Sequence, residues 1–260
     1  MLGIYFSGNG NTKYCVERFM ERYDGSPAVS IEDQEIIGLL QDAAEIVLGY
    51  PIHFGNVPKM VRDFITRNRS YFSGKNVFVI CTMRIFSGDG AGCGAKILSE
   101  YGAVVTGGLH LTMPDCVSDL KAVKTPAENR QRIGKAESKI VEAVEALKNG
   151  SPPQDGMSPV HHAAGMLLQR LWTGNKTRTY SNKLKIDDER CIGCGKCIGL
   201  CPMRNLSTSD EKVIPEGRCT MCYRCINNCP KKAITLLGRE VYEQYRLEDQ
   251  LLGTDEDNEI

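Results

Sequence analysis

Eight of the twelve cysteines stand in two short runs near the C-terminal end of the chain. Thiolates bind soft and borderline metals, and a reducing compartment disfavours disulfides, so these runs predict metal or iron–sulfur chemistry. The second run repeats the first after 28 residues, which indicates an internal duplication. The first run is Cys191, Cys194, Cys197 and Cys201, and the second is Cys219, Cys222, Cys225 and Cys229.

Each run has the spacing C-x2-C-x2-C-x3-C-P, with Pro202 and Pro230 in the last position. This spacing is typical of bacterial ferredoxins with two [4Fe-4S] clusters, in which the fourth cysteine of a run binds the other cluster. Zinc held by four cysteines is the alternative, although zinc requires neither this run nor the proline. The predicted ligands are Cys191, Cys194, Cys197 and Cys229 for cluster 1, and Cys219, Cys222, Cys225 and Cys201 for cluster 2.

A glycine-containing polar loop, Ser7–Thr12, follows the first apolar run and precedes an amphipathic stretch. Backbone N–H groups at the start of a helix bind phosphate, so the loop is a candidate anion site. It lacks the third glycine of the dinucleotide fingerprint, and the chain has no P-loop motif. An ordinary N-capping turn is the alternative interpretation.

Five apolar runs predict the strands that would position this loop: 2–6, 28–31, 45–50, 76–83 and 104–111. They alternate with helical patterns, which predicts a parallel α/β domain. The loops after the third and fourth strands, Tyr50–Pro58 and Thr82–Gly90, would therefore lie at the same edge as Ser7–Thr12. Open α/β sheets bind ligands at that edge.

These loops are similar to those of flavodoxins. Ser7–Thr12 resembles the flavodoxin phosphate loop, Pro51–Asn56 the loop along the flavin ring, and Phe86–Gly90 the second loop that flanks the ring. With its cysteine runs, the chain resembles a flavodoxin–ferredoxin fusion family of anaerobic bacteria. The resemblance implies a doubly wound parallel five-stranded sheet of order 2-1-3-4-5, a small α+β two-cluster ferredoxin domain, FMN, two [4Fe-4S] clusters and electron transfer.

The same resemblance assigns the flavin contacts. Asn9 stands where the family usually has threonine, and His53 or Phe86 would stack where flavodoxins have tryptophan or tyrosine. The phosphate would be held by Ser7, Asn9, Gly10, Asn11 and Thr12. The ring would be bordered by Pro51, Ile52, His53, Phe54, Gly55 and Asn56, and closed in by Thr82, Phe86, Gly88 and Asp89.

A cluster of turn-forming residues after Lys148 predicts a domain boundary. We expect the flavodoxin-like domain over 1–149 and the ferredoxin-like domain over 183–238. A linker with a short helix at 160–172 would occupy 150–182, and a C-terminal helix with an acidic tail would occupy 239–260.

The chain carries 32 basic and 32 acidic residues, which gives no reason to expect nucleic acid as a partner. It has neither an apolar stretch of membrane-spanning length nor the features of a signal peptide, so we expect a cytoplasmic protein without a membrane partner.

The leading functional hypothesis is electron transfer between the clusters, FMN and an external redox protein or small-molecule acceptor. The alternative is an oxidoreductase that reduces a small organic substrate at FMN, with His53 or Arg84 assisting. A zinc-stabilised interaction module is the non-redox hypothesis. Whether the chain is an enzyme or a carrier stays open at this point.

Overall fold

The structure, a computed structural model, describes residues 1–260 except 86–87, 122–124, 159–179, 181, 211 and 253–260. The described residues pack into two compact units. The first contains the described residues of 1–7, 11–114 and 131–158, and the second contains the described residues of 8–10, 115–130 and 180–252. Within the described residues, no helix combines the length and the apolar character needed to cross a membrane.

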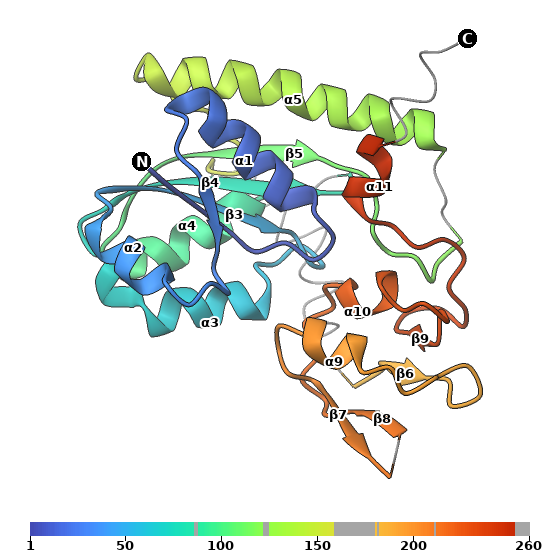
Figure 1. The fold of residues 1–260 in the computed structure, drawn as a ribbon. Coiled ribbons are helices and arrows are strands. Elements are labelled where there is room, and N and C mark those ends of the chain that lie inside the picture. Colours follow the sequence, from blue (N-terminus) through green and yellow to red (C-terminus); the bar gives the residue numbers. More distant parts are fainter. Residues whose placement is uncertain (86–87, 122–124, 159–179, 181, 211, 253–260) are drawn as a thin grey trace. The chain divides into compact units, whose positions relative to one another are not determined.

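A five-stranded parallel sheet forms the core of the first unit (Figure 1). The order β2-β1-β3-β4-β5 confirms the predicted doubly wound topology. The central strands β3 and β4 are buried on both faces, which explains why they appear in the sequence as continuous apolar runs. The strands are β1 (Leu2–Tyr5), β2 (Ala28–Ser30), β3 (Glu45–Pro51), β4 (Asn76–Met83) and β5 (Val104–Thr112).

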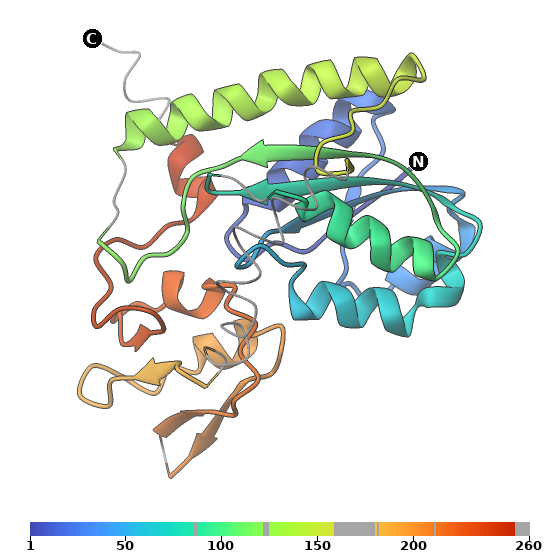
Figure 2. The ribbon, with the colours of Figure 1, turned by 180° about the vertical axis from the view of Figure 1, so that it is seen from behind.

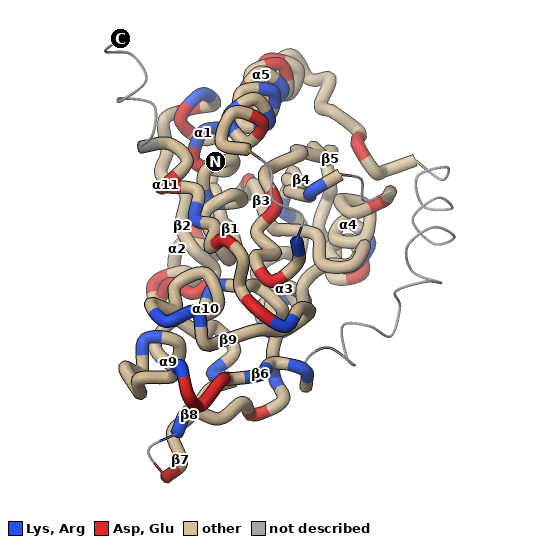
Figure 3. Tube along the Cα trace, turned by 90° about the vertical axis from the view of Figure 1, so that its right-hand side faces the viewer, with Lys and Arg blue, Asp and Glu red and all other residues tan. Residues whose placement is uncertain are grey.

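Helices cover both faces of this sheet (Figures 1 and 2). One face carries α1 (Asn11–Tyr23) and α5 (Pro126–Lys148), and the other carries α3 (Lys59–Arg67) and α4 (Gly90–Glu100). Basic and acidic residues alternate along α5 (Figure 3), as expected for a solvated helix face. The first unit also contains two shorter elements, α2 (Ile36–Asp42) and the 3-10 helix η1 (Arg69–Tyr71).

The second unit is small and built from short elements, which confirms the predicted α+β domain. Its strands form two antiparallel pairs: β6 (Lys185–Ile186) with β9 (Ile234–Thr235), and β7 (Leu206–Ser209) with β8 (Lys212–Pro215). Each cysteine run contains a short helix, α9 (Lys196–Leu200) or α10 (Arg224–Asn227), and these helices contact each other. The last helix is α11 (Leu247–Leu252).

The two units do not follow the chain in the simple order that the predicted boundaries describe. The described residues of 115–130 lie within the expected flavodoxin-like range 1–149, yet they pack in the second unit. The Cys116 carbonyl accepts a hydrogen bond from Asn227 Nδ2 at 3.0 Å, and the Ser118 carbonyl accepts one from the Tyr242 N–H at 2.9 Å. The predicted helix at 160–172 and the acidic residues from 255 lie outside the described residues.

A close approach between α4 and β3 yields a stability prediction. The ring of Tyr50 is fully buried, its hydroxyl donates to the Gly90 carbonyl at 2.9 Å, and a Cβ at Gly94 would lie 2.1 Å from that hydroxyl oxygen. Gly134 in α5 is the matched control, since a Cβ there meets nothing within 4 Å.

We expect Gly94→Ala to lower the free energy of unfolding by about 1–3 kcal/mol through overpacking. Gly134→Ala should raise it by up to about 1 kcal/mol, because alanine is the better helix former. Urea unfolding followed by far-UV circular dichroism measures both changes. Equal effects of the two substitutions would contradict the close packing of α4 on Tyr50.

Candidate functional site

The sheet order brings the ends of three strands together. β1, β3 and β4 are parallel neighbours, so the loops that follow them lie at one edge of the first unit. The hydroxyl oxygens of Thr12 and Thr82, both buried, are 2.7 Å apart and share a hydrogen bond that ties the start of α1 to β4. Asn11 Nδ2 also donates to the Pro114 carbonyl at 2.9 Å.

The loop after β3 makes a tight turn at this edge. His53 and Asn56 exchange two backbone hydrogen bonds, with N···O distances of 3.1 and 3.0 Å. Between them Phe54 and Gly55 have φ values of +50° and +74°, a conformation that suits glycine. The turn lies at the strand end, where the sequence predicts the flavin ring.

The loop after β4 is described in part. Gly88 adopts φ +59°, and Asp89 is completely buried at the start of α4. The loop residue Phe86, a predicted ring contact, lies outside the described residues.

The predicted phosphate loop is divided between the two units. Ser7, Asn11 and Thr12 belong to the first, and Gly8–Gly10 to the second. Asn9 Nδ2 donates to the Cys222 carbonyl at 2.9 Å, and a Cβ at Gly8 would lie 2.2 Å from that same carbonyl oxygen. Asn9, which stands where flavodoxins usually have threonine, therefore has a hydrogen-bond partner in the second unit.

The second unit contains two cavities lined by cysteines. Each brings together three cysteines of one run and the last cysteine of the other run. The cavity lined by Cys191, Cys194, Cys197 and Cys229 is called cavity 1, and the one lined by Cys201, Cys219, Cys222 and Cys225 is called cavity 2.

The cysteines surround these cavities and do not converge on a point. A zinc site requires four ligands at about 2.0–2.3 Å from one ion. Among the described residues, no three histidine, cysteine or acidic side chains are arranged to hold a single metal ion. Four cysteines that line one cavity suit a polynuclear cluster, which binds each thiolate at a different corner.

The two cavities differ in burial. Cys194 of cavity 1 is exposed, whereas Cys222 and Cys225 of cavity 2 are buried. Burial raises the pKa of Cys222 to about 12 and the pKa of Cys225 well above its ordinary value. These two thiols would keep their protons at neutral pH without bound cations, so a bound cluster must displace the protons.

The loops around the cavities require left-handed backbone at matching positions. Gly193 and Gly195 of the first run have φ values of +65° and +67°, which glycine adopts without steric cost. The second run has Met221 and Tyr223 there, both with φ +59°, a conformation that is costly for residues with a Cβ. Both side chains are buried, so packing holds the second loop in this shape.

Asp119 holds Tyr223 in place. The tyrosine hydroxyl donates to Asp119 Oδ1 at 2.8 Å, while Oδ2 accepts backbone hydrogen bonds from residues 236–238 at 2.6, 2.8 and 3.1 Å. The carboxylate is 1% exposed, and these four donors compensate its burial. Burial and the nearby negative charge raise the pKa of Tyr223, which keeps the phenol protonated as a donor.

Comparison with family models gives two matches in separate parts of the chain. A flavodoxin domain model matches residues 2–101, and a 4Fe-4S dicluster domain model matches residues 183–230. The chain joins a flavodoxin domain to a 4Fe-4S dicluster domain. With these domains the chain is an iron–sulfur flavoprotein with a role in electron transfer. Its cofactors are FMN and two [4Fe-4S] clusters.

Several solved structures are similar to part of the chain. A flavodoxin from the domain Archaea is 15% identical, with a TM-score of 0.41, and the match covers 56% of this chain and 97% of that one. For the two-electron reduced Megasphaera elsdenii flavodoxin the values are 21%, 0.38, 54% and 99%. For rubredoxin oxygen:oxidoreductase from Desulfovibrio gigas they are 17%, 0.38, 56% and 36%. No curated protein matches the chain.

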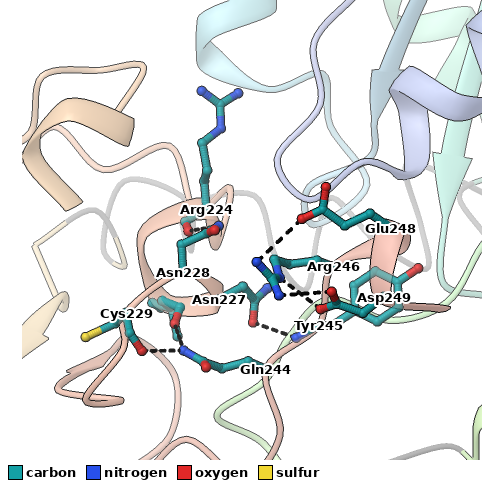
Figure 4. A network of polar contacts seen from close by, with 10 residues as sticks. Arg224, Asn227, Asn228, Cys229, Gln244, Tyr245, Arg246, Glu248 and Asp249 are labelled. Atoms are coloured by element: carbon teal, nitrogen blue, oxygen red, sulfur yellow. Dashed lines mark hydrogen bonds and ion pairs between the residues drawn. The ribbon is translucent and has the colours of Figure 1, made fainter. Parts of the chain in front are cut away.

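The segment after the dicluster domain is attached to α10 (Figure 4). Gln244 Nε2 donates to the carbonyls of Ile226 and Cys229 at 2.8 and 2.7 Å, and the Tyr245 N–H donates to Asn227 Oδ1 at 3.1 Å. Gln244 and Tyr245 therefore support the loop that ends in Cys229, a predicted cluster ligand.

Sequence reasoning missed the supporting residues of the second unit. Asp119, Asn227 and Gln244 carry no motif, and their partners are distant in sequence or are backbone groups. Comparison of the two cysteine runs offered one signal, because the second run has Met221 and Tyr223 at the positions where the first run has glycine. Side chains at left-handed positions imply that other residues hold the loop.

This arrangement predicts a graded loss of stability. Asp119→Ala leaves three backbone donors and the Tyr223 hydroxyl without an acceptor, and each unsatisfied buried group costs about 1–3 kcal/mol. Tyr223→Phe removes one hydrogen bond, so its effect should be smaller. The midpoint temperature of cluster loss, followed by visible absorbance, should fall further for Asp119→Ala. Equal midpoints for the two variants would contradict the role of Asp119 as a shared acceptor.

Proposed function

We propose that electrons pass within the chain between the two clusters and FMN, and that an external redox partner protein or small-molecule acceptor exchanges them with the chain. The pair of four-cysteine cavities, in one chain with a flavodoxin domain, carries this proposal. A two-domain chain of this kind raises the effective concentration of each redox centre for the other.

The cavities support a specific assignment of cluster ligands. Cluster 1 would be held in cavity 1 by Cys191, Cys194, Cys197 and Cys229, and cluster 2 in cavity 2 by Cys219, Cys222, Cys225 and Cys201. Backbone N–H groups support the thiolates: the Ala233 N–H lies 3.3 Å from Cys229 Sγ, and the Asn205 N–H lies 3.3 Å from Cys201 Sγ. Such bonds stabilise a thiolate ligand.

The flavin would be held at the edge formed by the ends of β1, β3 and β4. We assign its phosphate to the start of α1, at Ser7 and Asn9–Thr12, and its ring to Pro51–Asn56, Thr82, Phe86, Gly88 and Asp89. FMN exchanges either one or two electrons, whereas each cluster exchanges one at a time. The short His53–Asn56 turn would present backbone groups to the ring edge.

Cluster 1 is the better candidate for exchange with outside partners. Cys194 is exposed, and Ile192 beside it exposes 59% of its surface, whereas the central cysteines of cavity 2 are buried. We expect this exchange to take place in the cytoplasm, where thiols stay reduced.

The first test is the cofactor content of protein prepared without oxygen. About eight iron, eight acid-labile sulfide and one FMN per chain are expected from two clusters and one flavin. Zinc without sulfide would overturn the cluster assignment, and absence of flavin would overturn the FMN assignment. Flavin reduction that is first order and independent of protein concentration would support transfer within the chain.

Paired cysteine variants test the crossed ligation. In the proposed scheme Cys194 and Cys229 bind the same cluster, so the double variant Cys194→Ser/Cys229→Ser should keep one cluster and about four iron. The double variant Cys194→Ser/Cys201→Ser removes a ligand from each cluster and should lose nearly all iron. Iron analysis of both proteins decides, since uncrossed ligation predicts the reverse pattern.

A further inference from the structure

The two cysteine runs fold with the same backbone shape, so positions 28 residues apart can be compared directly. Residues of the two copies share left-handed backbone, and each copy places an N–H group 3.3 Å from the sulfur of its last cysteine. These N–H groups belong to Asn205 and Ala233, which are equivalent positions. The paired left-handed positions are Gly193 with Met221, Gly195 with Tyr223, and Arg204 with Lys232.

The side chains at two of the equivalent positions differ in chemistry. Cavity 2 is lined by Asn205 and Thr220, whereas their counterparts in cavity 1 are Ala233 and Ile192. The duplication therefore provides two polar side chains around cavity 2 and two apolar ones around cavity 1.

Both polar side chains are buried, with 1% of Asn205 and 4% of Thr220 exposed. Asn205 Nδ2 and Thr220 Oγ1 are buried atoms without a hydrogen-bond partner among the described residues. The orientation of the Asn205 amide is fixed, because its Oδ1 accepts a hydrogen bond from the Arg218 N–H. Two buried polar atoms without partners, both able to donate a hydrogen bond and both on residues that line one cavity, indicate a ligand with acceptor atoms.

We propose that Asn205 Nδ2–H and Thr220 Oγ1–H donate hydrogen bonds to sulfur atoms of cluster 2 and raise its reduction potential. The inference rests on the cluster assignment proposed above. Reduction adds one negative charge to a cluster, and hydrogen bonds to its sulfurs stabilise that charge. Ala233 and Ile192 offer cluster 1 no such side-chain donors.

The donors offset an effect of burial. Water stabilises the reduced form of an exposed cluster, so the burial of Cys222 and Cys225 by itself would lower the potential of cluster 2. Two donors supply part of the polar stabilisation that water gives to cluster 1. When one electron leaves reduced cluster 1, oxidised cluster 2 gains it, and no proton has to move.

Conservative variants test this inference in the complete protein with both clusters. Thr220→Val keeps the shape of the side chain and removes the hydroxyl, and Asn205→Ala introduces the residue that the second copy has at the equivalent position, Ala233. The matched control is Thr208→Val, because Thr208 lies in β7 and does not line either cavity. Potentiometric titration followed by electron paramagnetic resonance gives the midpoint of each cluster, and iron analysis confirms that both clusters are present.

We expect Thr220→Val and Asn205→Ala each to lower one midpoint, changing the distribution of electrons between the clusters by about tenfold. For a one-electron couple this is about 59 mV. The control should leave both midpoints unchanged. The reciprocal variant Ile192→Thr adds a donor to cavity 1 and should raise the other midpoint.

Full iron content with unchanged midpoints in Thr220→Val and Asn205→Ala would overturn the inference and leave the proposed electron-transfer function intact. Absence of iron and sulfide from the unaltered protein would instead overturn the proposed function itself. If Asn205→Ala loses its clusters because the Arg218 N–H loses its acceptor, the Thr220→Val midpoint decides alone.

Discussion

Four cysteine side chains must surround each small cavity of the dicluster domain, and this requirement controls much of the second unit. Cysteines with only two residues between them can face the same cavity only if the intervening backbone turns sharply, so left-handed positions recur in both copies. Glycine meets the requirement directly at 193 and 195. In the second copy, Met221 and Tyr223 need burial and hydrogen bonds to hold the same shape.

That need explains why the second unit includes chain from outside the cysteine runs. Asp119 is an acceptor for Tyr223 and for three backbone donors that follow β9, and Gly238 is obligatory beside it, since a Cβ there would lie 1.6 Å from the Asp119 carbonyl oxygen. Gln244 and Tyr245 support α10 from the C-terminal side. The matched range 183–230 therefore omits residues that its own loops depend on.

Features that depend on local pattern were predictable, and features that depend on distant partners were not. The strands follow from apolar runs, and their observed ends differ from the predicted ends by no more than one residue. The cysteine spacing predicted the two sets of four that line the cavities. No pattern marks residues 115–130 as part of the second unit, because the hydrogen bonds of Cys116, Ser118 and Asp119 reach partners more than a hundred residues away. The sequence does not mark Asn205 and Thr220 as cavity residues, because their significance depends on their burial and on the apolar residues at the equivalent positions of the other copy.

The differences between the two copies are best explained together. An exposed cluster exchanges electrons readily with outside molecules, and Cys194 with its neighbouring glycines leaves the first loop open to solvent. A buried cluster is protected, but the same burial removes the water that would stabilise its added charge. Cavity 2 contains the buried Cys222 and Cys225 of the second copy, and it is also lined by two polar side chains, Thr220 from the second copy and Asn205 from the first. A duplication that began with two equal halves can in this way produce one cluster site suited to contact with partners and another suited to hold an electron inside the protein.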